Sequence, residues 1–272
     1  MENKLSQTIP CQYDTIFSPF PAGAFPEALT FLEKTGFTGA ELAVAYPHKV
    51  NARALYKQLE AHGLACTTIS TGQIYGLDGL FLSSMDADIR ARAIGIIKGH
   101  IELSADLGAP NVTIGLVRGK LEPQEKKALL ENLKRALLPC IEYALKHNVT
   151  LQIEPINKAE TGLLNSTYDV LAFLKELGDP ENVGILYDTF HSNLEDGGMA
   201  EAIRAAAGKI TNVHFADSHR GLPGYGDIDF RAVTRALEET GYTGAYALET
   251  LSIPSPEFVN AHCFESLRAV FQ

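Results

Sequence analysis

Four metal-capable side chains stand near the ends of successive short β-rich runs in the second half of the chain: Glu154 in LQIEP, Asp188 in GILYD, His214 in NVHFAD and Glu249 in YALE. Taken singly, each would be an ordinary polar residue at a strand end. Glutamate and aspartate are poor strand formers, so four such residues in consecutive runs need a common reason. Three carboxylates and one imidazole suit Mn²⁺, Co²⁺ or Mg²⁺ better than a closed zinc site. The pattern predicts a divalent-metal site that leaves positions free for substrate oxygens.

The elements that carry these residues alternate along the chain as short β-rich runs and long helical patterns. An indistinct strand falls within Ile9–Phe17, and seven clear ones are Gly39–Val44, Ala65–Thr71, Asn111–Val117, Thr150–Pro155, Val183–Thr189, Ile210–Asp217 and Ala245–Thr250. Helical spacing of apolar residues is clearest over Asp86–Leu107 and Pro123–His147. Eight βα units without a Pro/Ser-rich linker predict a (β/α)₈ TIM barrel, a single domain over residues 1–272. The alternative, a doubly wound open sheet, lacks its GxGxxG signal after the first strand.

Composition restricts the class of protein. The 272 residues include 23 basic and 33 acidic side chains, a formal net charge of −10. This acidic balance argues against a nucleic-acid surface, which needs a dense basic patch. No apolar run approaches the roughly 20 residues of a membrane span, and the polar stretch Met1–Thr8 lacks a signal-peptide pattern. The four scattered cysteines, without a CxxC motif, indicate cytosolic thiols. We therefore expect a cytoplasmic protein that binds neither nucleic acid nor membrane.

Longer stretches around the four residues resemble the sugar phosphate isomerase/epimerase superfamily of xylose-isomerase-like barrels. They are Glu154–Asn165, Asp188–Asn193 and His214–Arg220 followed by Pro223-Gly224, and Glu249 closes the set. The resemblance is strongest to ketose 3-epimerases and 5-keto-L-gluconate epimerases, and Ser70–Gln73 and Ile114–Gly119 resemble the keto-gluconate branch in particular. It implies that Glu154, Asp188, His214 and Glu249 bind a divalent metal, usually Mn²⁺. It also implies a homo-oligomer with no organic cofactor.

By the same resemblance, Glu154 and Glu249 are the catalytic acid/base pair, and physical logic agrees with that assignment. Epimerisation beside a ketone removes a proton from one face of a carbon and returns one to the other, so two bases must flank the substrate. A divalent metal at the ketone and the neighbouring hydroxyl would acidify the C–H bond and stabilise the enediolate. No redox cofactor is required.

The resemblance further implies three substrate contacts. Glu160 would bind the terminal hydroxyl, His191 would contact the substrate oxygens, and Arg220 would stabilise the enediolate. Each has an alternative reading: Glu160 as a solvated loop acid, His191 as a packing histidine, and Arg220 as the partner of Asp217 or Asp227. Gln73, at the end of the third run, is a weaker candidate for a substrate contact.

Arg118 bears on the substrate class. It ends the fourth run in VTIGLVRGK, so it should face the same mouth of the barrel. A bidentate arginine suits a carboxylate or phosphate at the far end of a sugar. This favours a keto sugar acid, of the 5-keto-L-gluconate/D-tagaturonate type, over a neutral ketose. The alternative is a salt bridge from Arg118 to an acid such as Glu122.

Other functions remain open at this point. A neutral-ketose or ketose-phosphate 3-epimerase, or an aldose–ketose isomerase, would share the metal site and differ in the far-end pocket. An endonuclease-IV-like DNA-repair enzyme would need about three zinc ions and a positive groove, which the net charge of −10 disfavours. A barrel that has lost its metal and serves as a sugar sensor or scaffold is a third class. Glu41, inside the second run, is interpreted as structural.

Overall fold

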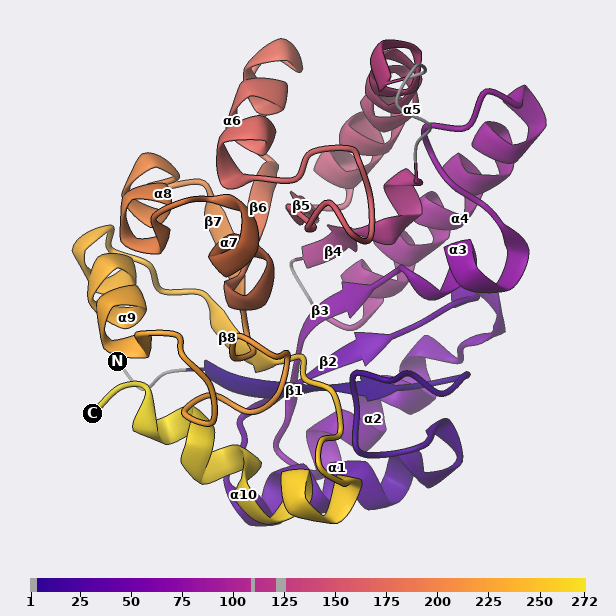
Figure 1. Cartoon of the computed structure of the whole chain (residues 1–272). Coiled ribbons are helices and arrows are strands. Elements are labelled where there is room, and N and C mark those ends of the chain that lie inside the picture. Colours follow the sequence, from indigo (N-terminus) through magenta and orange to yellow (C-terminus); the bar gives the residue numbers. More distant parts are fainter. Residues whose placement is uncertain (1–3, 109–110, 121–125) are drawn as a thin grey trace.

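The computed structural model describes residues 4–108, 111–120 and 126–272, and within them eight parallel strands close a barrel in sequence order (Figure 1). The strands are β1 Lys4–Pro10, β2 Gly39–Ala43, β3 Ala65–Ser70, β4 Asn111–Ile114, β5 Thr150–Ile153, β6 Val183–Asp188, β7 Ile210–Phe215 and β8 Ala245–Leu248. The predicted (β/α)₈ barrel is confirmed. The open-sheet alternative is wrong, because β8 pairs with β1 and leaves no sheet edge.

Helices surround the barrel in Figure 1. They are α1 Phe25–Thr35, α2 Ala52–Ala61, α3 Gln73–Asp78, α4 Ala87–Asp106, α5 Lys126–Lys146, α6 Thr167–Glu176, α7 Thr189–Glu195, α8 Met199–Ala205, α9 Phe230–Glu239 and α10 Pro256–Ala269, with 3₁₀ turns η1 Ala22–Ala24, η2 Pro47–Lys49 and η3 Leu116–Arg118. The predicted helix Asp86–Leu107 is confirmed as α4, which begins after the N-cap Asp86. For α5, the predicted start at Pro123 lies outside the described residues. No helix in the described ranges is both long and apolar enough to cross a bilayer.

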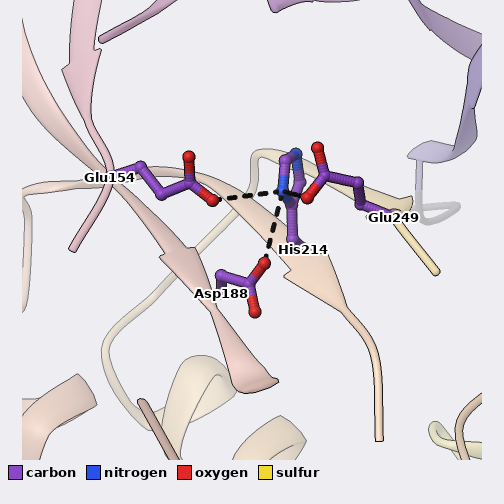
Figure 2. A group of neighbouring side chains, drawn as sticks. All are labelled: Glu154, Asp188, His214 and Glu249. Carbon is purple, nitrogen blue, oxygen red and sulfur yellow. Dashed lines mark ion pairs between the residues drawn. The ribbon is translucent and has the colours of Figure 1, made fainter. Parts of the chain in front are cut away.

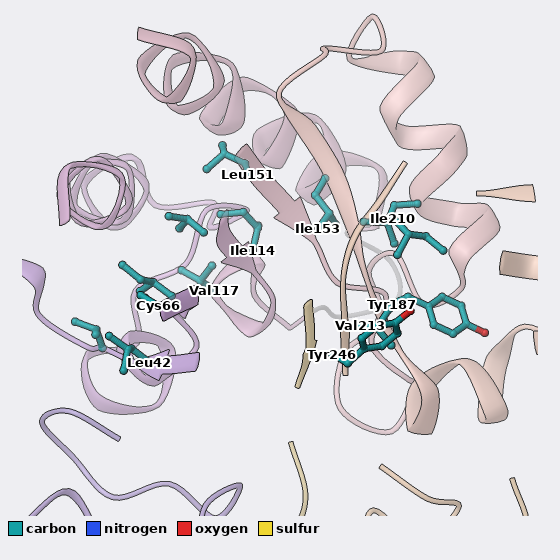
Figure 3. Close-up of a cluster of buried hydrophobic side chains, with 14 of the residues drawn as sticks. Leu42, Cys66, Ile114, Val117, Leu151, Ile153, Tyr187, Ile210, Val213 and Tyr246 are labelled. Carbon is teal, nitrogen blue, oxygen red and sulfur yellow. The ribbon is translucent and has the colours of Figure 1, made fainter. Parts of the chain in front are cut away.

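Two different environments line the two faces of the strands. Alternate apolar residues, among them Leu151, Ile153 and Val213, belong to one buried cluster between strands and helices (Figure 3). The intervening residues point into the barrel and are largely polar: Gln152 Nε2 donates to Thr68 Oγ1 at 3.1 Å and to Thr113 Oγ1 at 3.0 Å. Because side chains alternate along a strand, Glu154 shares the inward face of Gln152. The barrel interior thus supplies a polar support under the candidate site.

The first strand lies earlier than the sequence predicted. Of the expected run Ile9–Phe17, only the first two residues belong to β1, which begins at Lys4. The middle of β1 is polar yet buried, with Ser6, Gln7 and Thr8 at most 2% exposed, because both faces of a barrel strand are covered. Because these middle residues are polar, β1 lacks the hydrophobic pattern by which a strand is recognised in a sequence. The rest of the predicted run forms the β1–α1 loop.

Candidate metal centre and active site

The four metal-capable residues predicted from the sequence meet at the carboxyl end of the barrel (Figure 2). Asp188 is the last residue of β6 and pairs in register with His214 of β7. Glu154 and Glu249 follow directly after β5 and β8. The Nδ1 atom of His214 lies 3.8 Å from Glu154 Oε1, 3.6 Å from Asp188 Oδ2 and 3.4 Å from Glu249 Oε2. Figure 2 shows the two glutamates reaching His214 from opposite sides.

This cluster has the composition and spacing of a divalent-metal site. One ligand atom of each residue lies within 4.8 Å of all the others, and all four residues are buried. His214 Nδ1 is buried without a hydrogen-bond partner, an arrangement that costs free energy unless something else satisfies the atom. A cation shared by this nitrogen and the three carboxylates would do so. The residues present therefore fit a hard divalent cation.

The two glutamates have opposite electrostatic surroundings. Burial, followed by the charge of Glu249, raises the pKa of Glu154 to about 8. Burial acts in the same direction on Glu249, but the positive charges of His214 and Arg220 outweigh it and lower the pKa of Glu249. In the metal-free protein at neutral pH, one glutamate is therefore protonated while the other is ionised. Carboxyl groups whose pKa values are pushed apart are typical of an acid and base pair.

Arg220 neutralises part of the acidic cluster. Its Nη2 atom lies 3.3 Å from Asp188 Oδ2 and 2.5 Å from Glu249 Oε2. Burial opposes ionisation of Asp188, but Arg220 and the neighbouring histidines together outweigh it and lower the pKa of that carboxyl. The guanidinium lies 4.6 Å from the ring centroid of Phe17 and 4.9 Å from that of Phe190, so both rings stabilise its charge. Arg220 is thus fixed at the rim of the cluster.

The pairing of Arg220 with Asp217 or Asp227, considered as an alternative, is wrong. The Asp217 carboxylate instead accepts hydrogen bonds from four backbone N–H groups, those of Ser218, Gly224, Gly226 and Ile228. These bonds fold the glycine-rich loop after β7. The Arg220 N–H also donates to the Asp217 carbonyl oxygen at 2.7 Å. Asp217 therefore positions Arg220 through the backbone and leaves its guanidinium to the metal-site carboxylates.

His191 and Glu160 continue the polar wall beside Glu154. His191 Nε2 faces Arg220 Nη1 at 2.9 Å, and His191 Nδ1 faces Asn157 Nδ2 at 2.8 Å. Donors on both ring nitrogens disfavour a charged imidazole, and burial lowers the pKa of His191 to about 4. Glu160 Oε1 accepts from Asn157 Nδ2 at 2.9 Å and is only partly exposed. His191 therefore contacts the cluster as a neutral group, and Glu160 is not a freely solvated loop acid.

A pocket opens over the cluster. Its lining includes most of the predicted contacts: Glu154, Glu160, His191, His214, Arg220, Glu249 and Gln73. The opposite wall comes from the β1–α1 loop, residues 14–17, and from the ends of β1 to β4. Gln73 lies at the start of α3, where its Nε2 donates to the Tyr13 carbonyl oxygen at 2.6 Å. Gln73 thus closes the far end of the pocket by joining α3 to the β1–α1 loop.

Arg118 is not at the pocket, which corrects the substrate contact expected for it. Strand β4 ends at Ile114, and Arg118 lies in the following turn η3, fully buried. Its guanidinium donates only to backbone carbonyl oxygens, those of Ile114, Gly115, Glu154, Leu163 and Leu164. Glu122, the other suggested partner, lies outside the described residues. With all three guanidinium nitrogens engaged and the side chain fully buried outside the pocket lining, Arg118 joins β4 to the β5–α6 loop and does not face a substrate.

Glu41 is the site residue that the sequence interpretation missed. It comes from the middle of β2 and is fully buried, and both of its carboxylate oxygens approach His214 Nε2, at 3.0 and 2.9 Å. The signal that could have found it is the one used for the four metal-capable residues, a carboxylate inside a strand where such residues are disfavoured. Its position in the strand interior, rather than at the strand end, led to the structural interpretation.

Comparisons with known proteins agree with this geometry. Residues 29–268 match the model of a family described as xylose isomerase-like TIM barrels. The chain is 35% identical to the L-ribulose 3-epimerase of Mesorhizobium japonicum over 80% of this chain and 73% of the relative. It is 31% identical to a ketose 3-epimerase of Arthrobacter globiformis over 80% of this chain and 75% of the relative. A solved L-ribulose 3-epimerase structure superposes with a TM-score of 0.82 at 28% identity, covering 99% of this chain and 93% of the other.

Proposed function

The chain belongs to the xylose isomerase-like TIM barrel family, and from this premise we propose that it is a divalent-metal-dependent sugar epimerase that inverts the carbon beside a ketone. One observation carries the proposal. Two glutamates of the acidic cluster, Glu154 and Glu249, flank the metal-capable His214 from opposite sides and line one pocket. Two such groups are what a reaction needs when it removes a proton from one face and returns one to the other.

Each residue of the site has a defined part in this reaction. Glu154, Asp188, His214 and Glu249 would hold the metal, which when bound polarises the ketone. One of the two glutamates, ionised, would accept the proton from the carbon, and the other, having taken up a proton from solvent, would return a proton to the opposite face. Arg220 stabilises negative charge as it develops on the sugar oxygens. His191 and Glu160 orient the sugar as neutral and acidic hydrogen-bonding groups, respectively.

The lining of the pocket favours an uncharged ketose as the substrate. Arg220 is the only lysine or arginine among the described lining residues, and it is paired with Asp188 and Glu249. The wall away from the cluster is made largely of uncharged residues such as Thr8, Ser70, Thr71 and Gln73. With Arg118 bound to backbone carbonyls, the reason for preferring a keto sugar acid is gone. We therefore infer that the protein is a ketose 3-epimerase. The relatives from Mesorhizobium japonicum and Arthrobacter globiformis are both named as 3-epimerases.

Two alternatives are disfavoured on specific grounds. An endonuclease-IV-like enzyme needs several metal-ligand groups, whereas the described residues contain one such group. An aldose–ketose isomerase would use the same cluster, and only the position of proton exchange separates it from an epimerase. The relatives at 35% and 31% identity, both named as 3-epimerases, favour the epimerase.

Proton exchange with solvent tests the proposal directly. The protein is stripped with chelator, reloaded with Mn²⁺, Co²⁺ or Mg²⁺, and incubated in D₂O with ketopentoses, ketohexoses, ketose phosphates and keto-hexonates. We expect metal-dependent deuterium entry at C3 of a neutral ketose, with the epimer appearing in the NMR spectrum. Deuterium at C1 with an aldose product would establish an isomerase. Exchange confined to keto-hexonates would restore the keto sugar acid, and no exchange despite bound metal would overturn the proposed function.

A further inference from the structure

Glu41 and His214 face each other across the barrel, one from β2 and one from β7. Both are buried, at 0% and 1% exposure, and the two carboxylate oxygens lie 3.0 and 2.9 Å from His214 Nε2. The hydroxyl of Ser70 and the Asn212 amide, at 3.3 Å, also donate to this carboxylate. Among the described residues, His214 is the only cation-forming side chain that pairs with Glu41. The carboxylate is therefore surrounded by donors that all point at it.

This surrounding determines which nitrogen of His214 carries a proton. An ionised carboxylate can only accept hydrogen bonds, so the Nε2 atom that faces Glu41 must be the donor. A histidine that binds a metal is neutral and has one N–H group, so a proton on Nε2 leaves the Nδ1 lone pair for the cation. That free nitrogen is the atom that lies 3.4 to 3.8 Å from the three carboxylates. A carboxylate behind a metal-ligating histidine also fixes the ring plane and makes the ligand more basic.

We propose that Glu41 is a positioning residue that holds His214 as the Nε2–H tautomer with Nδ1 aimed at the three carboxylates, and thereby sets the affinity of the site for a divalent cation. This inference rests on the proposed function, because it presumes that the cluster binds metal. Glu41 does not line the pocket, so its effect on a sugar would be indirect. Its contribution should appear in metal binding itself, before any substrate is added.

A general role in barrel stability is the competing explanation, and Gln152 provides a matched control. Gln152 is also fully buried inside the barrel, where it exchanges hydrogen bonds with Thr68, Thr113 and Thr211. It has no hydrogen bond or ion pair with any of the four metal-capable residues. Replacing Gln152 by leucine therefore disturbs the same polar interior without changing the support of His214.

The experiment measures Mn²⁺ dissociation constants by calorimetry and by EPR for the wild-type protein and for Glu41→Gln, Glu41→Leu and Gln152→Leu. Circular dichroism melts of the metal-free proteins report their relative stabilities. We expect about a 100-fold weaker affinity for Glu41→Leu and about a tenfold loss for the shape-conserving Glu41→Gln, the range seen for residues behind metal ligands. For Gln152→Leu we expect the Mn²⁺ dissociation constant to change by less than about threefold, even if its melting temperature falls as much as that of the Glu41 variants.

A spectroscopic measurement separates positioning from stability. In ¹⁵N–¹H spectra of the Mg²⁺-loaded wild type, the His214 ring, assigned with a His214→Gln sample, should carry its proton on Nε2. Glu41→Leu should lose this single protonated state, whereas Gln152→Leu should keep it. Affinities for the Glu41 variants equal to wild type, or an equal loss in Gln152→Leu, would overturn the inference. If the wild-type protein itself binds no divalent cation, the proposed function fails instead.

Discussion

The two halves of the barrel mouth differ in what their strand ends present. At the ends of β5 to β8 stand charged or metal-capable residues: Glu154, Asp188, His214 and Glu249. At the ends of β1 to β4, the pocket is lined by small or uncharged residues: Thr8, Ala43, Ser70, Thr71 and Thr113. The second half holds the reactive groups, and the first half leaves room for the sugar that they act on. Substrate preference should therefore follow from the first half and reaction type from the second.

Two buried charges cross this division. Glu41 of β2 contacts His214 of β7, and Arg118 after β4 binds the backbone carbonyl oxygen of Glu154 after β5. Neither lines the pocket. Residues of the first half of the barrel thus also hold His214 and Glu154 of the second half in position. Arg118 has only backbone carbonyl oxygens as hydrogen-bond partners. Burial lowers the pKa of Arg118 to about 10, so the side chain is still charged at neutral pH.

The largest effect should come from the reactive half. We expect Glu249→Gln, and separately Glu154→Gln, to lower kcat by about 10³-fold or more at saturating Mn²⁺, because each removes one of the two proton-transfer groups. Turnover is measured by NMR with the best ketose substrate, and deuterium exchange at C3 is measured in the same samples. Bound Mn²⁺ is quantified in each variant so that loss of metal is not mistaken for loss of a base.

The matched variant in the other half is Thr8→Ala. Thr8 lines the same pocket from the end of β1, and its buried hydroxyl has no hydrogen-bond partner. We expect kcat to change by less than about tenfold, since only one substrate or water contact is at stake. If Thr8→Ala lowered kcat as much as Glu249→Gln does, the strand ends of β1 to β4 would take part in the reaction, and the contrast between the two halves would be wrong.

The next largest effect is expected at Arg118, which follows β4 and binds the backbone carbonyl oxygen of Glu154 after β5. Arg118→Met should remove the donor from two buried carbonyl oxygens, those of Glu154 and Leu163, and reduce the free energy of unfolding by about 3 kcal/mol. It should also let Glu154 shift, and a misplacement of about 1 Å can cost ~100-fold in rate. Chemical denaturation and kcat/KM are measured beside the exposed control Arg231→Met. Because no substrate carboxylate is involved, the loss should be equal for a neutral ketose and a keto-hexonate; a loss confined to the acid would contradict this.

The sequence predicted the reactive half far better than its supports. Glu154, Asp188, His214 and Glu249 were visible because local context alone places a strand end at the barrel mouth. Arg118 was misplaced because the run NVTIGLV continues the β pattern past Ile114, while the chain turns there into η3. The role of Glu41 depends on a partner 173 residues away, and no local pattern specifies such a contact. The strand β1 was hidden because a buried polar strand lacks hydrophobic alternation.

A smaller effect should appear in the pH dependence of metal binding by the reactive half. In the metal-free protein, burial and Glu249 raise the pKa of Glu154 to about 8, so at lower pH a cation must displace the Glu154 proton. Burial acts against the charge of His214, but Glu41 and Glu249 raise the pKa of His214 well above its usual value, so the proton on Nδ1 must leave as well. We therefore expect the Mn²⁺ dissociation constant to fall by more than about tenfold per pH unit between pH 6 and 7.5. Calorimetry in buffers of different ionisation enthalpy counts the protons released. An affinity independent of pH would contradict the assigned proton on Glu154.

The smallest effect should come from the far wall of the pocket, at Gln73. This side chain joins α3 to the Tyr13 carbonyl oxygen, and its Oε1 atom is buried without a partner. Gln73→Leu should raise KM by about fivefold, the equivalent of one hydrogen bond of about 1 kcal/mol, and leave kcat nearly unchanged. The control is Leu77→Ala on the same short helix, which is exposed and does not line the pocket. Comparison of ketopentoses with ketohexoses sharpens the test, because a wall at the far end should matter more to the longer sugar. A fall in kcat with KM unchanged would mean that this wall takes part in the reaction, and the contrast between the two halves would no longer hold.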